Sequence, residues 1–286
     1  MHKRIYISDL DGTLLNNDPA LSEYSQRQIN HLIESGVEFT IASARNIASL
    51  RRLLGNIQFR LPVIEINGAF ITDYHSGKHL VVNDITSSLT HEITKTILDI
   101  GCMPFICAYD GERDNIYYEQ VVNGGMEWFL NDDSEQHTDR IRQIETLEHI
   151  HSEQIVCYTV IGPNAIVKEL SDAITAKFAD LLDCYFFQNI YSPQWYWLTI
   201  HDRNARKEIA IKKLIELYGY SPRQLTVFGD QLNDEGMMLL NKIGSETVAV
   251  ENAAEKIKQI ASKTIGVNIH DSVVNYILEQ NNISPV

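Results

Sequence analysis

Cysteine is scarce in this sequence: there are four, and no two of them form a C-x-x-C pair. A zinc cluster and a disulfide framework are therefore not expected, and we interpret the cysteines as buried thiols in a reducing compartment. Glycine and proline are also few, at 15 and 7 of 286 residues, which excludes collagen-like and low-complexity chains. With 44% hydrophobic residues, the sequence predicts a folded globular protein with one large core or two modest ones.

Basic residues are fewer than acidic ones. The chain has 24 Lys and Arg residues and 38 Asp and Glu residues, which gives a formal net charge of -14. Such a chain repels nucleic acid and anionic membranes unless it carries a basic patch, and no basic run is longer than Arg51-Arg52 or Lys212-Lys213. No segment approaches the roughly 20 apolar residues of a membrane span, and the first residues lack a signal-peptide stretch. We expect a cytoplasmic protein without nucleic-acid or membrane partners, which needs a cation or a helix N-terminus to bind an anion.

The N-terminal part of the chain alternates short apolar runs with helical spacing. Residues 5–7, 37–41 and 63–66 are rich in β-branched and aromatic side chains, as buried strands are. Residues 22–36 and 47–54 show helical spacing between these runs. Strand, helix, strand, helix, strand predicts an α/β domain with a doubly wound, mainly parallel, Rossmann-like sheet.

The pattern changes after residue 68. Residues 70–72 and 80–82 indicate a hairpin that leads out of the parallel sheet. Beyond it, two helical stripes each lead to a strand, and the four segments are residues 89–100, 105–109, 166–178 and 182–187. We predict that residues 85–189 form an inserted α+β layer, with the polar residues 131–140 as a loop.

The parallel pattern resumes in the C-terminal third. The expected elements are strands at 195–201, 225–228 and 247–250 and helices at 205–218, 253–261 and 273–278. Residues 1–84 and 190–286 are therefore predicted to form one domain that the insertion interrupts.

Three polar clusters follow strands of this domain. They are Asp9–Thr13, Ser43–Arg45 and Gly229–Asp234. Because the carboxyl ends of parallel strands lie along one edge of the sheet, where open α/β folds bind ligands, we expect these clusters to converge into a site.

Carboxylates dominate the expected site. Asp9, Asp11, Asp230 and Asp234 repel one another unless one is protonated or a hard divalent cation lies among them. A set of oxygen ligands without His or Cys favours Mg²⁺ over zinc. A bound Mg²⁺ would also turn this negative edge into a receptor for phosphate.

Two carboxylates one residue apart at a strand end can divide the chemistry. One can attack as a nucleophile, because aspartate forms acyl phosphates, while the other donates a proton to the leaving oxygen and then activates water. Ser43, ahead of a helix expected near Ala44, offers a hydroxyl and helix N-terminal amides to phosphate oxygens. Lys207, near the start of its helix, can supply the positive charge that phosphoryl transfer requires.

These motifs resemble a known family. Asp9-Leu-Asp-Gly-Thr-Leu, Ser43, Lys207 and Gly229-Asp230-x-x-Asn233-Asp234, in this order, resemble the four motifs of the haloacid dehalogenase superfamily, specifically its Cof-type sugar-phosphatase branch. The resemblance extends to Asn67-Gly68-Ala69 and Glu251-Asn252-Ala253. It implies that the insertion is a cap that determines substrate specificity.

The resemblance also implies roles for the site residues. Asp9 would be the nucleophile and Asp11 the general acid and base. Asp9, the backbone carbonyl of Asp11 and Asp230 would hold Mg²⁺, with Asp234 as a supporting residue. Apart from the resemblance, we interpret Arg45 as a structural or supporting residue of the site. The phosphoryl group would be held by Leu10, Ser43, Ala44, Lys207 and Asn233. Two residues depart from the family pattern, because Ala44 and Glu208 stand where the family usually has glycine, yet neither departure removes a reacting group.

Three functions are compatible with this sequence. The first is a Mg²⁺-dependent phosphatase of a small phosphorylated metabolite, a sugar phosphate. The second is a phosphotransferase or mutase that uses the same motifs, and the third is a non-catalytic ligand-binding protein. The sequence does not identify the phosphate ester, the cap residues that contact it or the oligomeric state.

Overall fold

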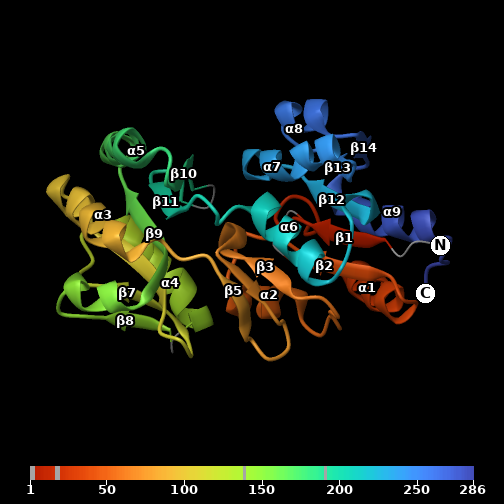
Figure 1. The fold of residues 1–286 in the computed structure, drawn as a ribbon, viewed down its shortest axis with the longest axis horizontal. Coiled ribbons are helices and arrows are strands. Elements are labelled where there is room, and N and C mark those ends of the chain that lie inside the picture. Colours follow the sequence, from red (N-terminus) through yellow and green to blue (C-terminus); the bar gives the residue numbers. More distant parts are fainter. Residues whose placement is uncertain (1–3, 17–19, 138–139, 190–191) are drawn as a thin grey trace. The chain divides into compact units, whose positions relative to one another are not determined.

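The structure is a computed structural model that describes residues 4–16, 20–137, 140–189 and 192–286. The chain forms two compact units (Figure 1). Met1–Val81 and Arg206–Val286 make the first, here called the core unit, and Val82–Ala205 make the second, the inserted unit.

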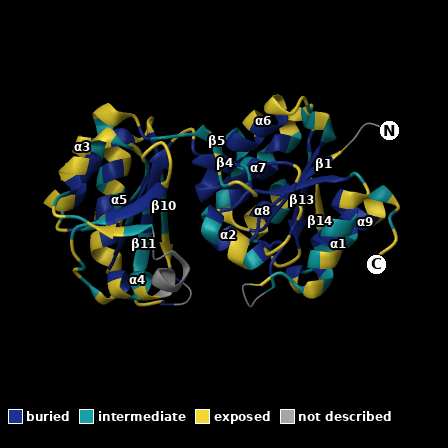
Figure 2. Cartoon of the chain, turned by 90° about the horizontal axis from the view of Figure 1, so that it is seen from below, coloured by how far each residue is buried: buried dark blue, intermediate teal, exposed yellow. Residues whose placement is uncertain are grey.

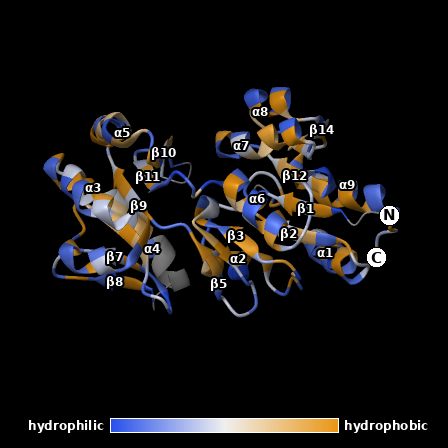
Figure 3. Ribbon diagram, in the orientation of Figure 1, coloured by the Kyte–Doolittle hydropathy of each residue, from blue (hydrophilic) through white to orange (hydrophobic). Residues whose placement is uncertain are grey.

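A five-stranded parallel sheet organises the core unit. Its strands, in spatial order, are β14 (Lys263–Ile265), β13 (Glu246–Val250), β12 (Leu225–Gly229), β1 (Ile5–Ser8) and β2 (Glu38–Ile41). The four residues of β1 and the five of β12 are all buried, as expected for central strands covered on both faces. Figures 2 and 3 show these strands as the buried and hydrophobic centre of the unit. This sheet confirms the predicted fold class.

Helices cover the two faces of this sheet. They are α1 (Glu23–Glu34), α2 (Ile47–Leu54), α6 (Lys207–Leu217), α7 (Glu235–Met238), α8 (Glu255–Ile260) and α9 (Ser272–Asn281). The Ser22 hydroxyl caps α1 by accepting from Ser25 N at 2.9 Å, as its position in the sequence predicts. Buried aliphatic side chains of α1 and α6 belong to the hydrophobic core of this unit, and α1 contacts β2 and α9.

The order of the strands places a switch point at β1. The connection through α1 leads from β1 to β2, which lies on one side of β1. β12 lies on the other side of β1, and β13 and β14 follow it in order, each farther from β1. Right-handed crossovers therefore place α1 and α7 on opposite faces, and the direction reverses at the carboxyl ends of β1 and β12, the kind of position at which open α/β sheets bind ligands.

The third predicted strand of the parallel sheet lies elsewhere. β3 (Val63–Glu65), β4 (Phe70–Thr72) and β5 (His79–Val82) form a separate three-stranded sheet, in which β3 and β4 are antiparallel. A single parallel bridge between Ala42 and Ile64 connects β3 to the end of β2. The predicted hairpin of β4 and β5 is present, and it takes β3 as a partner because the chain reverses at the tight turn Ile66–Gly68.

The inserted unit has a six-stranded sheet with helices. Its strands, in spatial order, are β10 (Leu182–Gln188), β11 (Tyr196–Asp202), β9 (Gln154–Gly162), β6 (Pro104–Tyr109), β7 (Asp114–Tyr118) and β8 (Ile141–Gln143), and its helices are α3 (Ser87–Asp99), α4 (Gly124–His137) and α5 (Asn164–Phe178). Its pairings are antiparallel except that of β7 with β8.

Two predictions for this unit are wrong. The strand at 195–201 was expected in the core, but β11 pairs with β10 and β9, so the unit extends to Ala205 and not to residue 189. The expected loop at 131–140 is helical as far as His137, because α4 is anchored by the apolar residues Met126 and Phe129 in its first turns. Residues 138–139 of that loop lie outside the described residues.

In the described ranges, every helix falls short of the length and apolarity that crossing a membrane requires.

Candidate active site

Asp9 and Asp230 come first after two neighbouring buried strands. Asp9 follows β1, Asp230 follows β12, and the backbone N–H of Asp9 donates to the carbonyl of Phe228 at 2.9 Å. Their exposed fractions are only 5% and 2%. The parallel pairing of β1 with β12 therefore brings two carboxylates, far apart in the sequence, to the switch point of the sheet.

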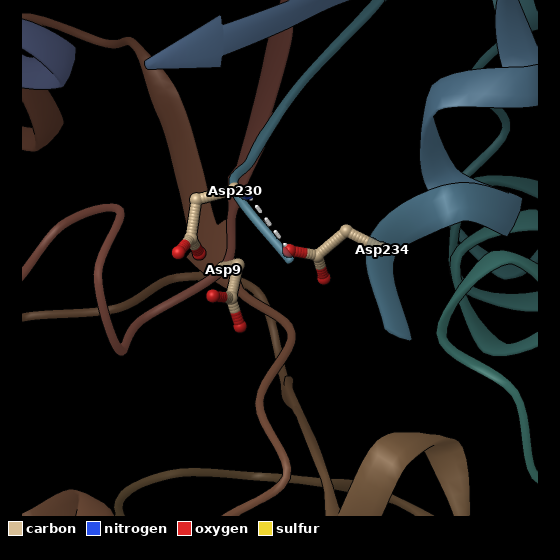
Figure 4. Close-up of side chains that lie close together, drawn as sticks. All are labelled: Asp9, Asp230 and Asp234. Carbon is tan, nitrogen blue, oxygen red and sulfur yellow. Dashed lines mark hydrogen bonds between the residues drawn. The ribbon is translucent and has the colours of Figure 1, made fainter. Parts of the chain in front are cut away.

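Asp234 completes a buried acidic cluster with Asp9 and Asp230. Oxygen atoms of the three carboxylates lie within 4.8 Å of one another (Figure 4). Asp234 ends the 3-10 turn Leu232–Asp234, and its Oδ2 accepts from the backbone N–H of Asp230 at 3.0 Å and of Gln231 at 3.3 Å. These two hydrogen bonds within the loop after β12 fix the position of the Asp234 carboxylate.

Lys207 is the cation of this cluster. Its Nζ lies 2.5 Å from Asp9 Oδ1 and 2.8 Å from Asp234 Oδ1, and the side chain is 1% exposed. Burial disfavours the charged lysine, but the carboxylates of Asp234 and Asp9 outweigh it and raise the pKa of Lys207. As the first residue of α6, Lys207 is positioned by the start of that helix.

Two acids of the cluster, Asp9 and Asp230, have raised pKa values. Burial, followed by the charge of Asp234, raises the pKa of Asp9 well above its ordinary value despite the nearby lysine. The same two causes raise the pKa of Asp230 to about 6. One ammonium does not balance three carboxylates, so the cluster fits a hard divalent cation, and its all-oxygen donors suit Mg²⁺.

Thr13 is a site residue that the sequence reasoning missed. Its hydroxyl donates to Asp230 Oδ1 at 2.8 Å and lies 3.4 Å from Asp9 Oδ2. Gly12, the residue before Thr13, has a φ of +77°, and a Cβ on Gly12 would collide with Asp230 Oδ2. The signal was present, since both residues belong to the Asp9–Thr13 motif.

Asp11 lies apart from the buried cluster. Its side chain is 46% exposed and forms a two-armed ion pair with Arg45, from Nε to Oδ2 at 2.8 Å and from Nη2 to Oδ1 at 2.7 Å. Arg45 is in turn held by Ser49 Oγ, which lies 3.2 Å from Nη1. Asp9 is therefore buried, whereas Asp11, two residues later, is open to solvent.

The loop after β2 carries Ser43 and Ala44, and the helix expected to begin near Ala44 begins later. Ser43 is buried, its backbone N–H donates to the carbonyl of Ile64 at 2.9 Å, and its Oγ accepts from Arg45 N at 3.1 Å. α2 begins at Ile47 with Asn46 as its cap, so no helix starts at Ala44. The Ser43 hydroxyl proton, and not a helix N-terminus, is what this loop offers to an anion.

Two other predicted contacts lie on the loops that carry the aspartates. Leu10 is buried between Asp9 and Asp11, and its carbonyl accepts from the backbone N–H of Leu14 and Leu15. Asn233 is half-buried on the turn that ends at Asp234.

Two asparagines support the loop that follows Asp9. Asn252 Nδ2 donates to the Gly12 carbonyl at 2.7 Å, and its Oδ1 accepts from Asn268 N at 3.0 Å. Asn268 Nδ2 donates to the Leu15 carbonyl at 2.7 Å. Asn252, from the motif Glu251-Asn252-Ala253, thus anchors the loop that follows Asp9.

Comparison with known proteins identifies the family. The family model for haloacid dehalogenase-like hydrolases matches residues 6–277, so the chain belongs to this family. The chain is 23% identical over 272 residues to 5-amino-6-(5-phospho-D-ribitylamino)uracil phosphatase YitU of Bacillus subtilis, with 95% of each chain covered. It is 26% identical over 296 residues to pyridoxal phosphate phosphatase YbhA of Escherichia coli, covering 97% of this chain and 98% of that protein.

Solved structures share the fold. TM0651 from Thermotoga maritima matches with a TM-score of 0.78 and 24% identity, over 99% of this chain and 98% of that one. The resemblance to the haloacid dehalogenase superfamily, predicted from the motifs, is confirmed.

Proposed function

We propose that this chain is a Mg²⁺-dependent phosphatase that hydrolyses a small phosphate monoester, a sugar phosphate, through an aspartyl phosphate on Asp9. The observation that carries the proposal is the buried pairing of Asp9 with Lys207, next to Asp230, at the switch point of the sheet. The reaction class is phosphoric monoester hydrolysis, the class named for both curated relatives.

Asp9 acts as the nucleophile. Lys207 and Thr13 flank its two oxygens, so the carboxylate is held in one orientation before substrate arrives. Asp9, Asp230 and the backbone carbonyl of Asp11 would hold Mg²⁺, which would offset the repulsion between the carboxylates and an incoming phosphate. Asp234 supports the site by holding Lys207 and the backbone of Asp230.

Asp11 acts as the general acid and base. A bond forms between an Asp9 oxygen and phosphorus, the ester P–O bond breaks, and the leaving alkoxide takes a proton from Asp11. Water then gives a proton to Asp11 and attacks phosphorus, which breaks the bond to Asp9 and releases inorganic phosphate. The exposed position of Asp11 suits both transfers, because leaving group and water reach it from solvent.

The phosphoryl oxygens are bound by groups from four segments. Lys207 supplies the charge, Ser43 a hydroxyl proton and Asn233 an amide, while the backbone at Leu10 and Ala44 completes the set. These residues come from the ends of β1, β2 and β12 and from the start of α6. Glu208, the second departure from the family pattern, is half-buried on α6 and leaves the contacts of Lys207 intact.

The inserted unit selects the substrate. Its sheet and helices form a separate compact body inserted within the sequence of the core unit, which supports its assignment as a cap that determines substrate specificity. Both curated relatives are named for small phosphorylated metabolites, which supports a substrate of that class.

Phosphate release from a panel of small esters tests this function. The panel contains sugar phosphates, pyridoxal phosphate and a phosphorylated ribitylaminouracil, each with Mg²⁺ and with EDTA. We expect turnover of at least one sugar phosphate that requires Mg²⁺ and is lost in Asp9→Asn. The control is Asp172→Asn, which removes an exposed carboxylate paired with Lys168 and should leave turnover unchanged. Transfer to an added acceptor sugar without phosphate release, or turnover that Asp9→Asn retains, would contradict the proposal.

A further inference from the structure

The turn Ile66–Gly68 combines unusual backbone conformations. The φ angles of Ile66, Asn67 and Gly68 are +48°, +53° and +104°, so three successive residues lie in the left-handed region. Glycine tolerates this region, but a β-branched isoleucine rarely adopts it, and such strain persists only where surrounding structure enforces it.

Asn67 carries a second cost. It is 7% exposed, and its side-chain Oδ1 is buried without a hydrogen-bond partner among the described residues. A buried acceptor without a donor is destabilising. The strained backbone of Ile66 and the unpaired acceptor of Asn67 both destabilise the turn. Two such costs on neighbouring residues point to a function for the turn beyond reversing the direction of the chain.

One side of the turn holds the loop after β2. The backbone N–H of Asn67 donates to the Ser43 carbonyl at 2.9 Å, and that of Ile66 donates to the Arg45 carbonyl at 3.1 Å. The loop that carries the Ser43 hydroxyl is therefore fixed by backbone hydrogen bonds to the turn.

The other side of the turn abuts the start of α6. A Cβ on Gly68 would lie 2.7 Å from the carbonyl oxygen of Arg206 and 2.8 Å from its carbonyl carbon. That oxygen accepts from the backbone N–H of Ile209 and of Ala210, both at 3.0 Å, in the first turn of α6. Gly68 thus lies directly against the peptide that precedes Lys207.

We propose that the turn Ile66–Gly68 positions Ser43 and Lys207 relative to Asp9, with Gly68 as the positioning residue for Lys207. The proposal rests on the proposed phosphatase function for its kinetic consequences. The turn lies against two of the three segments that bind the phosphoryl group from outside the Asp9 loop, so a shift of the turn moves both.

Gly68→Ala tests the positioning of Lys207. The added methyl group has to push the Arg206 peptide away, and the Lys207 ammonium moves with it. We expect kcat to fall about 100-fold, as for catalytic groups displaced by about 1 Å. The matched control is Gly36→Ala, in the same unit, where φ is +90° but no atom lies within 4 Å of the added Cβ. Equal losses of kcat in the two variants would overturn the proposal.

A double-mutant cycle separates positioning from general damage. In a Lys207→Met background the loss caused by Gly68→Ala should nearly vanish, because the group that it misplaces is gone. Additive losses would overturn the proposal. Should Gly68→Ala fail to fold, Asn67→Gly takes its place in the cycle, since it adds no atoms and suits the left-handed backbone. Asn67→Gly should keep or raise the melting temperature while lowering kcat. An unchanged kcat would overturn the proposal that the turn positions Ser43 and Lys207.

Crystal structures of Gly68→Ala and of the unaltered chain give a readout that does not depend on turnover. We expect the variant to lose the contacts of Lys207 Nζ with Asp9 and Asp234, which are 2.5 and 2.8 Å in the unaltered chain. Retention of both contacts would overturn the proposal. If the unaltered chain hydrolyses no ester, the proposed function fails, and the two structures still decide the role of the turn.

Discussion

Arg45 holds both carboxylate oxygens of Asp11, at 2.8 Å through Nε and at 2.7 Å through Nη2. A two-armed pair of this kind fixes the plane of the carboxylate as well as its position. Asp11 is thereby oriented by a residue from the neighbouring strand end and not by the buried cluster around Asp9. Proton transfer by Asp11 should accordingly depend on Arg45.

Arg45→Ala is expected to lower kcat about tenfold, because Asp11 loses its fixed orientation. Arg45→Lys should recover only part of this loss, since an ammonium cannot bind both oxygens in the same plane. The melting temperature should change little, as an ion pair this exposed contributes at most about 1 kcal/mol. Arg4→Ala, which removes the exposed pair with Glu246 in the same unit, is the control, and an equal kcat in all three variants would refute the dependence.

Lys207→Met should lower kcat about 1,000-fold, to a residual rate that can still be measured, and should also destabilise the fold. Removing the ammonium leaves Asp9 and Asp234 buried without their cation, a change that costs about 3–5 kcal/mol in other proteins. Urea unfolding with EDTA measures the loss. Lys213→Met, on the exposed face of the same helix, provides the comparison and should unfold like the unaltered chain. Equal unfolding midpoints for the two variants would show that the buried pair does not stabilise this unit.

The raised pKa of Asp230 predicts how the metal-free protein responds to pH. Burial and Asp234 raise this pKa from 3.8 to about 6, so between these values the folded state binds more protons than the unfolded state. The free energy of unfolding therefore falls as pH rises from about 4 to about 6, by about 3 kcal/mol from this group. Urea unfolding in EDTA across this range measures the slope.

Mg²⁺ and a substitution serve as controls for this slope. Saturating Mg²⁺ should stabilise the protein more at pH 7 than at pH 4, because it competes with protons for the carboxylates. Asp230→Asn should reduce the slope in EDTA. A variant slope as steep as that of the unaltered chain would place the responsible groups elsewhere.

Thr13→Val is expected to weaken Mg²⁺ activation. The substitution keeps the volume of the side chain but removes the hydroxyl that donates to Asp230 Oδ1 at 2.8 Å. The Mg²⁺ concentration for half-maximal activity should rise about tenfold, the size of effect seen when a partner of a metal ligand is lost. Thr13→Ser retains the hydroxyl and should behave like the unaltered chain. An equal Mg²⁺ concentration for half-maximal activity in Thr13→Val and Thr13→Ser would show that the Thr13 hydroxyl does not support metal binding.

The meeting of Asp9 and Asp230 could be predicted from the sequence because it follows from topology. Residues after neighbouring parallel strands share one edge, whatever the loops between them do. The direction of the side chains could not be predicted in this way. Asp11 lies only two residues after Asp9 yet is open to solvent and paired with Arg45, a residue from the loop after the neighbouring strand β2.

Strand partners were harder to predict than strand positions. The predicted runs at 63–66 and 195–201 correspond to β3 and β11, but apolar composition is the same whichever sheet a strand joins. β3 takes β4 as an antiparallel partner because of the turn at Ile66–Gly68, and β11 pairs with β10 through a short connection. Such pairings depend on backbone conformations that only the folded chain displays.

The central claim is that phosphorus passes through Asp9. The most direct measurement is an acid quench of the unaltered chain with Mg²⁺ and a radiolabelled aryl phosphate, followed by counting of the label that stays on the protein. We expect labelled protein, more label in Asp11→Asn, where activation of water is lost, and none in Asp9→Asn. Label retained by Asp9→Asn, or turnover by the unaltered chain without any labelled protein, would contradict the account.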